Sequence, residues 1–310
     1  MSELITLINY IAVSIFGSIL SAAFCGIGKE KKQRNLIVFT VGVALIIEGI
    51  VYYFYGYFDL VNKQKIKEGN EINIVVPTGN FGNILAAYYS KRMGLPIGKL
   101  ICSSNENNVL TDFLNTGIYD KRRDLILTES PSMDILISSN LERLIFEANN
   151  RDAEKTKKLM EELNENGVYS ISNESRKFLK DFYGNYADTK EVYKAIKEVY
   201  EKENYLMDTH TAVGYVVLNK YKNETGDNRQ VLIVSTASPY KFPRSICRAL
   251  GLDVSNKNDF EVLKLLNEYT NIEIPNNLKG LDVKKVIHNK VCNKEKMKES
   301  LLEFLKENKN

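Results

Sequence analysis

The chain is poor in the residues that build metal, redox and nucleic-acid sites. Among its 310 residues are two histidines and four cysteines, and no cysteine pair has Cys-x-x-Cys spacing. These counts argue against a zinc site, which needs four clustered ligands, and favour free thiols in the cytosol. The formal net charge is only +3, and basic residues are interspersed with acidic ones. We therefore expect neither a metal nor a nucleic-acid partner.

Charge is absent from the N-terminal segment Leu4–Ile27. A run of this length can cross a hydrocarbon core of about 30 Å as a helix. A signal peptide would begin with basic residues, whereas Glu3 precedes this run. A basic loop, Lys29–Arg34, follows, and then a second apolar stretch at about Leu36–Ile50. The sequence predicts that residues 1–49 form one or two membrane segments and that residues 4–27 attach the chain to a membrane.

The remaining sequence alternates between strand and helix patterns. Runs of β-branched residues predict strands at Ile72–Val76, Lys99–Ser103 and Val231–Ser235. Helical patterns are found at Ile84–Arg92, Met133–Phe146, Asp152–Asn164, Asp188–Glu203, Thr211–Tyr221 and Lys294–Leu305. The helix predicted at Asp188–Glu203 opens with a capping box. This alternation favours an α/β fold whose parallel sheet is covered on both faces.

The first predicted strand leads into the glycine-containing turn Pro77-Thr-Gly-Asn-Phe-Gly-Asn83. Such a turn before a helix can direct several backbone N–H groups at one point, where the helix N-terminus adds partial positive charge. Gly79 and Gly82 would allow positive φ angles and a close approach of the backbone to a ligand. The spacing matches neither G-x-G-x-x-G nor a P-loop. It fits an ordinary strand–helix turn as well as a phosphate site.

A family resemblance is more specific than the spacing. The segment Val75–Tyr88 resembles the phosphate-binding loop of threonine synthase, a pyridoxal-phosphate (PLP) lyase of the tryptophan-synthase-β-like fold. The likeness continues, in the family's order, through Ile101–Phe113, Ser130–Ile135, Ser138–Leu144, Asp208–Gly214 and Ser235–Pro243. It covers about residues 50–310, which resemble the C-terminal half of that enzyme. The resemblance implies a partial PLP fold-type-II three-layer sandwich with a parallel sheet, and the apolar N-terminal runs predict one or two membrane helices before it.

The resemblance also implies roles for individual residues. It places the phosphate of PLP on Gly79, Asn80, Phe81, Gly82 and Asn83. Thr236 ends a predicted strand, where ligands of open α/β sheets gather, and its hydroxyl would contact the pyridine nitrogen. His210 and Lys241 would contact the substrate, a small phosphorylated amino acid. Without the resemblance, His210 reads as a structural histidine and Lys241 as a surface lysine.

One expected part is missing from the sequence. The first half of threonine synthase carries the Schiff-base lysine, and no segment here resembles that motif. The family converts O-phosphohomoserine and water to threonine and phosphate, a step of threonine biosynthesis. We therefore expect a threonine synthase-like lyase that has no catalytic residue of its own, holds PLP non-covalently and is inactive as this chain. A separate N-terminal half would complete it. The alternative is a non-catalytic, membrane-tethered fragment or fusion product.

Overall fold

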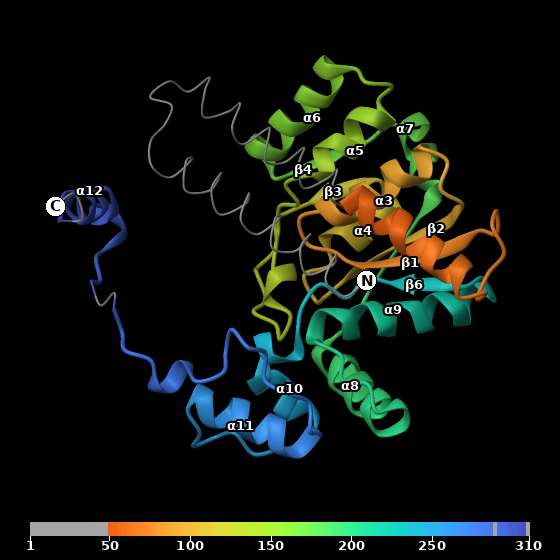
Figure 1. Ribbon diagram of the computed structural model, residues 1–310. Helices are drawn as coiled ribbons and strands as arrows, with labels where there is room; N and C mark the ends of the chain where they lie inside the picture. Colours follow the sequence, from red (N-terminus) through yellow and green to blue (C-terminus); the bar gives the residue numbers. More distant parts are fainter. Residues whose placement is uncertain (1–48, 288–289, 308–310) are drawn as a thin grey trace. The chain divides into compact units, whose positions relative to one another are not determined.

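The computed structural model describes residues 49–287 and 290–307, which fall into two compact units divided at residue 256 (Figure 1). The predicted membrane segment Leu4–Ile27 lies outside the described residues, as does nearly all of Leu36–Ile50. Within the described ranges, no helix combines the length and the apolar character that spanning a membrane requires. Membrane attachment therefore stays a prediction from the sequence.

The first unit is built on a parallel sheet with strand order β5-β2-β1-β6. Its strands are β1 (Ile72–Pro77), β2 (Ile97–Ser104), β5 (Phe182–Tyr186) and β6 (Val231–Ile233). A second, antiparallel pair joins β3 (Ile118–Asp120) to β4 (Val168–Ser170). The predicted α/β class with a parallel sheet is confirmed. All four strands of the main sheet run in one direction, so their carboxyl ends meet at one edge.

Helices surround this sheet. Residues 49–62 are helical. The helices that follow in the first unit are α3 (Gly82–Arg92), α4 (Val109–Thr116), α5 (Leu141–Ala148), α6 (Ala153–Asn166), α7 (Asn173–Lys177), α8 (Thr189–Glu203), α9 (Thr209–Thr225) and α10 (Pro243–Ala249). Short 3₁₀ turns lie at Pro131–Met133, Phe178–Asp181 and Pro239–Lys241. The second unit holds α11 (Asp259–Thr270), α12 (Met297–Glu307) and two further 3₁₀ turns, Leu281–Val283 and Lys294–Lys296.

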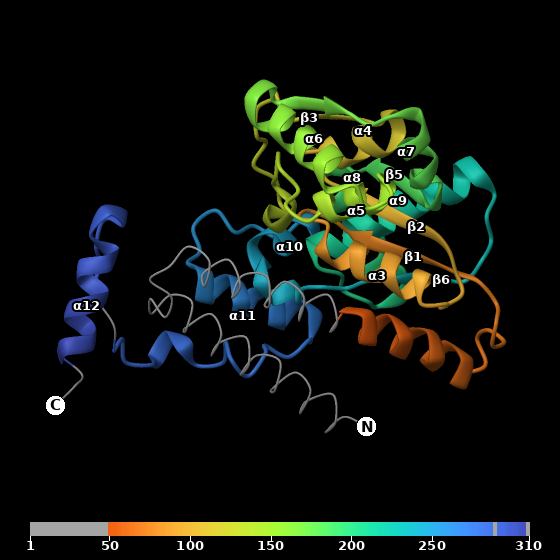
Figure 2. The ribbon, with the colours of Figure 1, turned by 90° about the horizontal axis from the view of Figure 1, so that it is seen from above.

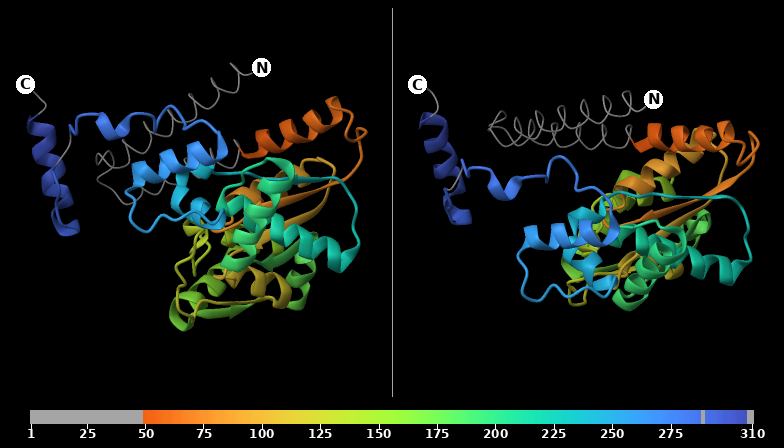
Figure 3. Two further views of the ribbon diagram at one scale, coloured as in Figure 1. Left: turned by 90° about the horizontal axis from the view of Figure 1, so that it is seen from below. Right: turned by 60° about the horizontal axis from the view of Figure 1, so that its bottom comes forward.

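The side chains of the strands alternate between two hydrophobic clusters, as the pleat of a sheet requires. Val75 and Ile101 face α9, where they pack with Val217 and Tyr221. The neighbouring strand residues pack instead in the larger cluster formed with α3 and α4, and these residues are Ile74, Val76, Leu100 and Cys102. Figures 1, 2 and 3 show helices on both faces of the sheet. The sheet is therefore the middle layer of three.

Local sequence signals set most helix boundaries. The predicted capping box is present at the start of α8, where Asp188 accepts from the Glu191 backbone and the Glu191 side chain accepts from the Asp188 backbone. Asp152 likewise caps α6 by accepting from Lys155 N–H. In the second unit, Asn258 and Glu261 form another capping box at α11. Caps of this kind satisfy N–H groups that have no partner inside the helix.

Two predicted elements differ from the structure. The helix expected over Met133–Phe146 is confirmed only from Leu141, where α5 begins; before it, a 3₁₀ turn at Pro131–Met133 is followed by a loop. Hydrogen bonds keep this loop from forming a helix, because Ser138 and Asn140 donate to backbone carbonyls of the turn after β1. Strand β6 ends at Ile233 rather than Ser235, and its side chains are only half-buried.

Candidate active site at the carboxyl edge of the sheet

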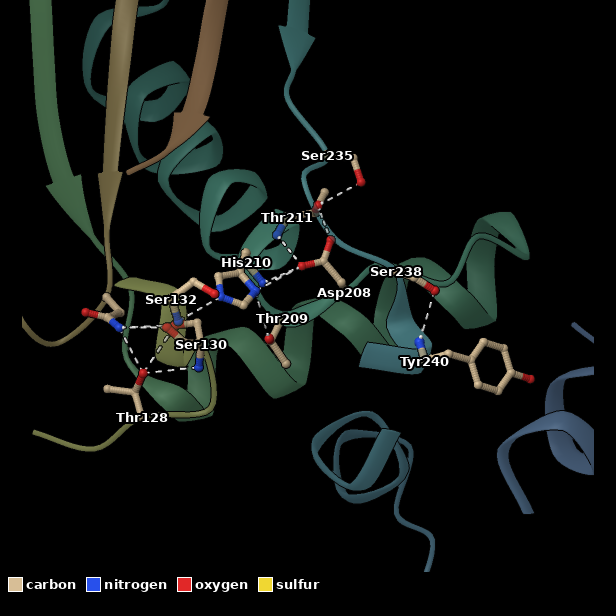
Figure 4. A network of polar contacts seen from close by, with 11 residues as sticks. Thr128, Ser130, Ser132, Asp208, Thr209, His210, Thr211, Ser235, Ser238 and Tyr240 are labelled. Atoms are coloured by element: carbon tan, nitrogen blue, oxygen red, sulfur yellow. Dashed lines mark hydrogen bonds and ion pairs between the residues drawn. The ribbon is translucent and has the colours of Figure 1, made fainter. Parts of the chain in front are cut away.

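The candidate site is assembled from three loops at the carboxyl edge of the sheet. The turn after β1 supplies residues 78–81, the N-terminus of α9 supplies Asp208–Thr211, and the segment after β6 supplies Ser235. A fourth segment, Thr128–Asp134, lies between them. Figure 4 shows the polar side chains of this network beyond the ends of the strands. The pattern is that of open α/β sheets, whose ligands bind outside the carboxyl ends of the strands.

The turn after β1 is fixed by bonds to its carbonyl groups. Ser138 Oγ donates to Gly79 O at 2.8 Å. Asn140 donates to Asn80 O twice, from its backbone N at 3.1 Å and from Nδ2 at 2.8 Å. In a trans peptide the N–H points opposite to the C=O of the preceding residue. The N–H groups of Asn80 and Phe81 therefore point away from the 138–140 segment.

Close packing requires a glycine at position 79, whereas the contact at Gly82 is looser, and neither glycine is needed for backbone freedom. A Cβ on Gly79 would lie 2.7 Å from Ser132 O, and one on Gly82 would lie 3.3 Å from Asn140 Nδ2. Neither glycine has a positive φ, which contradicts one sequence-based reason for them. The left-handed residue is Phe81, with φ 63°. Its ring is fully buried against Phe182, at a centroid distance of 5.9 Å, and this burial offsets the strain.

Helix α3 begins directly after Phe81, which makes no side-chain capping bond. The first N–H groups of a helix have no intrahelical partner, and the helix dipole adds partial positive charge there. These groups and the amides of Asn80 and Phe81 lie in one continuous stretch of chain, which we call the cradle (residues 79–83). Asn83 has a second contact, because its Oδ1 accepts from Tyr53 OH at 2.6 Å.

The segment that packs on Gly79 is held by a buried polar cluster around Asp134. Asp134 Oδ1 accepts from the side-chain amides of Asn105, at 2.7 Å, and Asn107, at 3.0 Å, both of which follow β2. Asp134 also accepts from the backbone and the hydroxyl of Thr128. These bonds fix Thr128–Asp134, so that Ser132 O is held against Gly79.

His210 connects this segment to α9. Its Nε2 accepts from the Ser132 N–H at 3.3 Å, so Nε2 carries no proton. The ring proton is then on Nδ1, which lies 3.2 Å from Asp208 Oδ1. The ring is buried and packs 5.2 Å from the Phe242 ring. Both ring nitrogens are thus engaged by the protein, and His210 serves here to position the Ser132 segment.

Asp208 is the central hydrogen-bond acceptor at the start of α9. It accepts from the His210 and Thr211 backbones, and from the Thr211 hydroxyl. Burial raises the pKa of the Asp208 carboxyl, but the hydrogen bonds from His210 and Thr211 outweigh it and hold the pKa below its usual value. The Thr211 hydroxyl also lies 3.1 Å from Ser235 Oγ, which connects α9 to the end of β6. In its ionised form, the Asp208 carboxylate therefore holds the start of α9 in place.

The remaining predicted site residues lie near this network. Thr236 is exposed and follows Ser235 in the segment after β6. Lys241 is exposed, and its ammonium lies 5.3 Å from the centre of the Phe242 ring, the ring that packs on His210. The cradle, His210 and the end of β6 thus belong to one connected edge. The roles of Thr236, Lys241 and the cradle residues in binding stay predictions.

Comparisons with known proteins identify the family. Residues 211–298 match the model described as threonine synthase, C-terminal. The chain is 41% identical to human threonine synthase-like 1, over 72% of this chain and 30% of that protein. The C-terminal part of this chain belongs to the threonine synthase family. Among solved structures, threonine synthase from yeast superposes with a TM-score of 0.66 at 35% identity, over 77% of this chain and 47% of that one.

A second solved relative contains bound PLP. PLP-bound threonine synthase from Brucella melitensis superposes with a TM-score of 0.61 at 34% identity, over 73% of this chain and 50% of that one. The chain thus spans between about a third and a half of the length of these relatives. The match shows the family and the fold of the matched part, while activity, substrate and partners belong to the proposal below.

Sequence reasoning missed the residues that support the cradle. Ser138, Asn140 and Asp134 belong to segments that resemble the family, yet nothing in their spacing assigns them to the turn after β1. They contact it only in three dimensions, through bonds to residues about 60 positions earlier in the case of Ser138 and Asn140. A run of Ser, Asn and Asp just before a helix was the available clue, because such residues bind backbone groups of turns.

Proposed function

We propose that this chain supplies the cofactor-phosphate site of a threonine synthase-like PLP lyase. The observation that carries the proposal is the cradle, in which the carbonyls of Gly79 and Asn80 are bound from one side by Ser138 and Asn140. Their partner amides and the uncapped N-terminus of α3 are left for an anion. A phosphate monoester has the charge and the acceptor oxygens that suit such a site.

The residues present fit PLP at both of its ends. The phosphate would bind the cradle formed by Gly79, Asn80, Phe81, Gly82 and Asn83. The exposed hydroxyl of Thr236, after the adjacent strand β6, would meet the pyridine nitrogen. A neutral hydroxyl partner leaves that nitrogen unprotonated. Bound PLP supplies an electron sink for carbanion chemistry at an amino-acid substrate.

The protein's own residues bind and orient. Ser138 and Asn140 keep the cradle amides aimed at the phosphate. His210 and Asp208 hold the Ser132 segment and the start of α9 in place on the two flanks of the site. The exposed ammonium of Lys241 provides a positive charge for the phosphate of a substrate such as O-phosphohomoserine.

Turnover requires a lysine from outside this chain. The family's lysine motif has no counterpart in the printed sequence, and the chain matches about half of the yeast and Brucella proteins. The proposal is therefore that the isolated chain binds PLP without a covalent bond and releases no phosphate from O-phosphohomoserine. A separate polypeptide that corresponds to the N-terminal half would restore turnover.

Equilibrium dialysis of the full chain tests the proposal. Pyridoxine 5′-phosphate is the probe, because it lacks the aldehyde and cannot react with surface lysines. We expect it to bind at least about tenfold more tightly than pyridoxine. Pyridoxine has no phosphate and so loses several hydrogen bonds from the backbone amides of the cradle. A release assay with O-phosphohomoserine and PLP should give no inorganic phosphate. Equal affinity for the two probes, or turnover by the chain alone, would contradict the proposal.

A second candidate, a non-catalytic fragment tethered to a membrane, is favoured by the charge-free run Leu4–Ile27. Deleting residues 1–34 should move the product out of the membrane fraction, if that run partitions into lipid. Unchanged fractionation would remove this candidate. The cradle measurement is independent of it, because the two candidates can hold together.

A further inference from the structure

A buried tyrosine of the helix of residues 49–62 contacts the cradle. Tyr53 is only 3% exposed, and its hydroxyl donates to Asn83 Oδ1 at 2.6 Å. The same hydroxyl lies 3.3 Å from the backbone oxygen of Asn83. Burial raises the pKa of the Tyr53 phenol well above its usual range, so the hydroxyl keeps its proton and is a donor at neutral pH. Both oxygens of Asn83 therefore face Tyr53.

Close packing of two helices brings this hydroxyl to the cradle. A Cβ on Gly49 would lie 2.8 Å from Ala86 Cβ, so any side chain at position 49 would push its helix away from α3. Tyr53 lies one helical turn after Gly49. Asn83 lies about one turn before Ala86 on α3. The contact between Tyr53 and Asn83 is therefore part of a helix–helix interface and does not depend on a loop.

The other end of the Asn83 carboxamide carries a donor. Oδ1 and Nδ2 lie on opposite sides of the carboxamide carbon, so a bond that holds Oδ1 toward Tyr53 turns Nδ2 away from it. Asn83 is exposed, and Nδ2 has no hydrogen-bond partner in the part of the chain that the structure describes. Asn83 is the second residue of α3. Helix side chains lean toward the N-terminus of their helix, so this carboxamide lies near the N–H groups that open α3.

We propose that Tyr53 is a positioning residue of the cofactor-phosphate site, whose hydroxyl holds the Asn83 carboxamide with Nδ2, and not Oδ1, toward the phosphate. This inference rests on the proposed function, because that function places a phosphate at the cradle. The orientation matters because a carboxamide rotated by half a turn presents an oxygen, which repels a phosphate oxygen where Nδ2 would donate to it. Without the Tyr53 hydroxyl, both orientations are open to the side chain.

Equilibrium dialysis of the full chain with pyridoxine 5′-phosphate and pyridoxine tests the inference. Tyr53→Phe should weaken binding of pyridoxine 5′-phosphate about threefold to tenfold and leave the affinity for pyridoxine unchanged, because only the phosphate meets Asn83. Tyr57→Phe is the matched control. Tyr57 is also buried on the same helix, but its hydroxyl bonds to the backbone of residues 69–70 and not to the cradle. This variant should leave both affinities unchanged.

Variants of Asn83 separate positioning from a structural role. In an Asn83→Ala background, Tyr53→Phe should not weaken pyridoxine 5′-phosphate any further, because no carboxamide is left to orient. A tyrosine that only supported the packing of the two helices would weaken binding equally in both backgrounds. Asn83→Asp keeps an acceptor for Tyr53 but replaces the donor with a charged oxygen. It should therefore bind pyridoxine 5′-phosphate more weakly than Asn83→Ala does.

Three results would overturn the inference. Tyr53→Phe could bind pyridoxine 5′-phosphate as tightly as Tyr57→Phe does, its effect could be the same with and without Asn83, or Asn83→Asp could bind as tightly as the unmodified chain. The Asn83→Asp comparison decides the inference even if circular dichroism shows that Tyr53→Phe does not fold. Equal affinity of the unmodified chain for the two probes would remove the proposed function and this inference with it. A preference for pyridoxine 5′-phosphate that Tyr53→Phe leaves intact would remove this inference alone.

Discussion

The two sides of the candidate site are built differently. On the β1 side, the cradle is closely packed and its carbonyls are bonded: Gly79 touches the Ser132 backbone, and Phe81 is buried in the larger cluster. On the β6 side, a half-buried strand of three residues leads into exposed Ser235 and Thr236. The first side is complete within this chain. The second is open to solvent within the part of the chain that the structure describes.

This difference separates two tasks that one protein chain usually performs together. Holding a phosphate needs fixed amides, and the supports of those amides are all present. Under the proposed function, a lysine from an N-terminal half would reach the cofactor from the exposed side. A substitution that disturbs the backbone packing of the turn after β1 should therefore affect folding and phosphate binding together, whereas substitutions on the β6 side should affect binding alone.

Gly79→Ala should have the largest effect. Its Cβ would lie 2.7 Å from Ser132 O and 3.3 Å from Met133 Cα, and both contacts are backbone atoms that cannot rotate away. We expect a loss of about 3 kcal/mol in the free energy of unfolding, at the upper end for overpacking. Selective binding of pyridoxine 5′-phosphate should be lost as well. Chemical denaturation and dialysis measure the two effects.

Gly82→Ala is the matched comparison. The nearest atom to its Cβ is Asn140 Nδ2 at 3.3 Å, which belongs to a side chain that can shift. The cost in unfolding free energy should be below about 1 kcal/mol, because alanine also favours a helix. Equal losses for the two variants would show that the contact with Ser132 is not what fixes the cradle.

Asp208→Asn should have the next largest effect, with a distinct pH dependence. The folded-state pKa of Asp208 is depressed, so ionisation stabilises the fold above the unfolded pKa of about 4 and this contribution disappears as the pH falls through the folded value. The unmodified chain should be more stable than the variant by about 1–2 kcal/mol at pH 7. The difference should shrink as the pH is lowered below about 4. If the difference in unfolding free energy, measured by urea titration, did not change with pH, the ionisation of Asp208 would not be its cause.

Asn140→Ala should weaken the cradle with little effect on folding. The variant lacks the hydrogen bond from Asn140 Nδ2 to Asn80 O, whereas the hydrogen bond from the backbone N–H of residue 140 to the same oxygen remains. Affinity for pyridoxine 5′-phosphate should fall about tenfold and affinity for pyridoxine should not change, because only the phosphate contacts the cradle. Asn219→Ala, at an exposed position of α9, is the control and should leave both affinities unchanged.

Thr236→Val should have the smallest effect on stability. Thr236 is exposed, so the free energy of unfolding should change by less than about 0.5 kcal/mol. Loss of one hydrogen bond to the pyridine ring should weaken both pyridoxine 5′-phosphate and pyridoxine, about threefold to tenfold. If only the affinity for pyridoxine 5′-phosphate changed, Thr236 would lie near the phosphate of the cofactor and not near its pyridine nitrogen.

The predictability of each element follows from where its determining contacts lie. Strand β1, α3 and the capping box of α8 are set by residues within a few positions of one another, and the sequence predicts them. The region Met133–Phe146 has a helical pattern, but hydrogen bonds to the distant turn at Gly79 and Asn80 keep its first half in a loop. Strand β5 was missed because Phe182–Tyr186 holds a central glycine and polar residues.

The same distinction applies to the site. The cradle residues are contiguous, so a motif can point to them. The sequence was wrong about the glycines, since positive φ occurs at Phe81, where burial against Phe182 outweighs the strain. His210 and its partner Ser132 are 78 residues apart, and no local pattern predicts that contact.

The central claim is that the turn after β1 is by itself a phosphate site of the cofactor. Amide chemical-shift titration of the ¹⁵N-labelled full chain tests it most directly. Pyridoxine 5′-phosphate should shift the amides of Asn80, Phe81, Gly82 and Asn83 more than any others, and pyridoxine at the same concentration should leave them in place. Shifts that are equal for the two probes, or that are centred on surface lysines away from α3, would contradict the account.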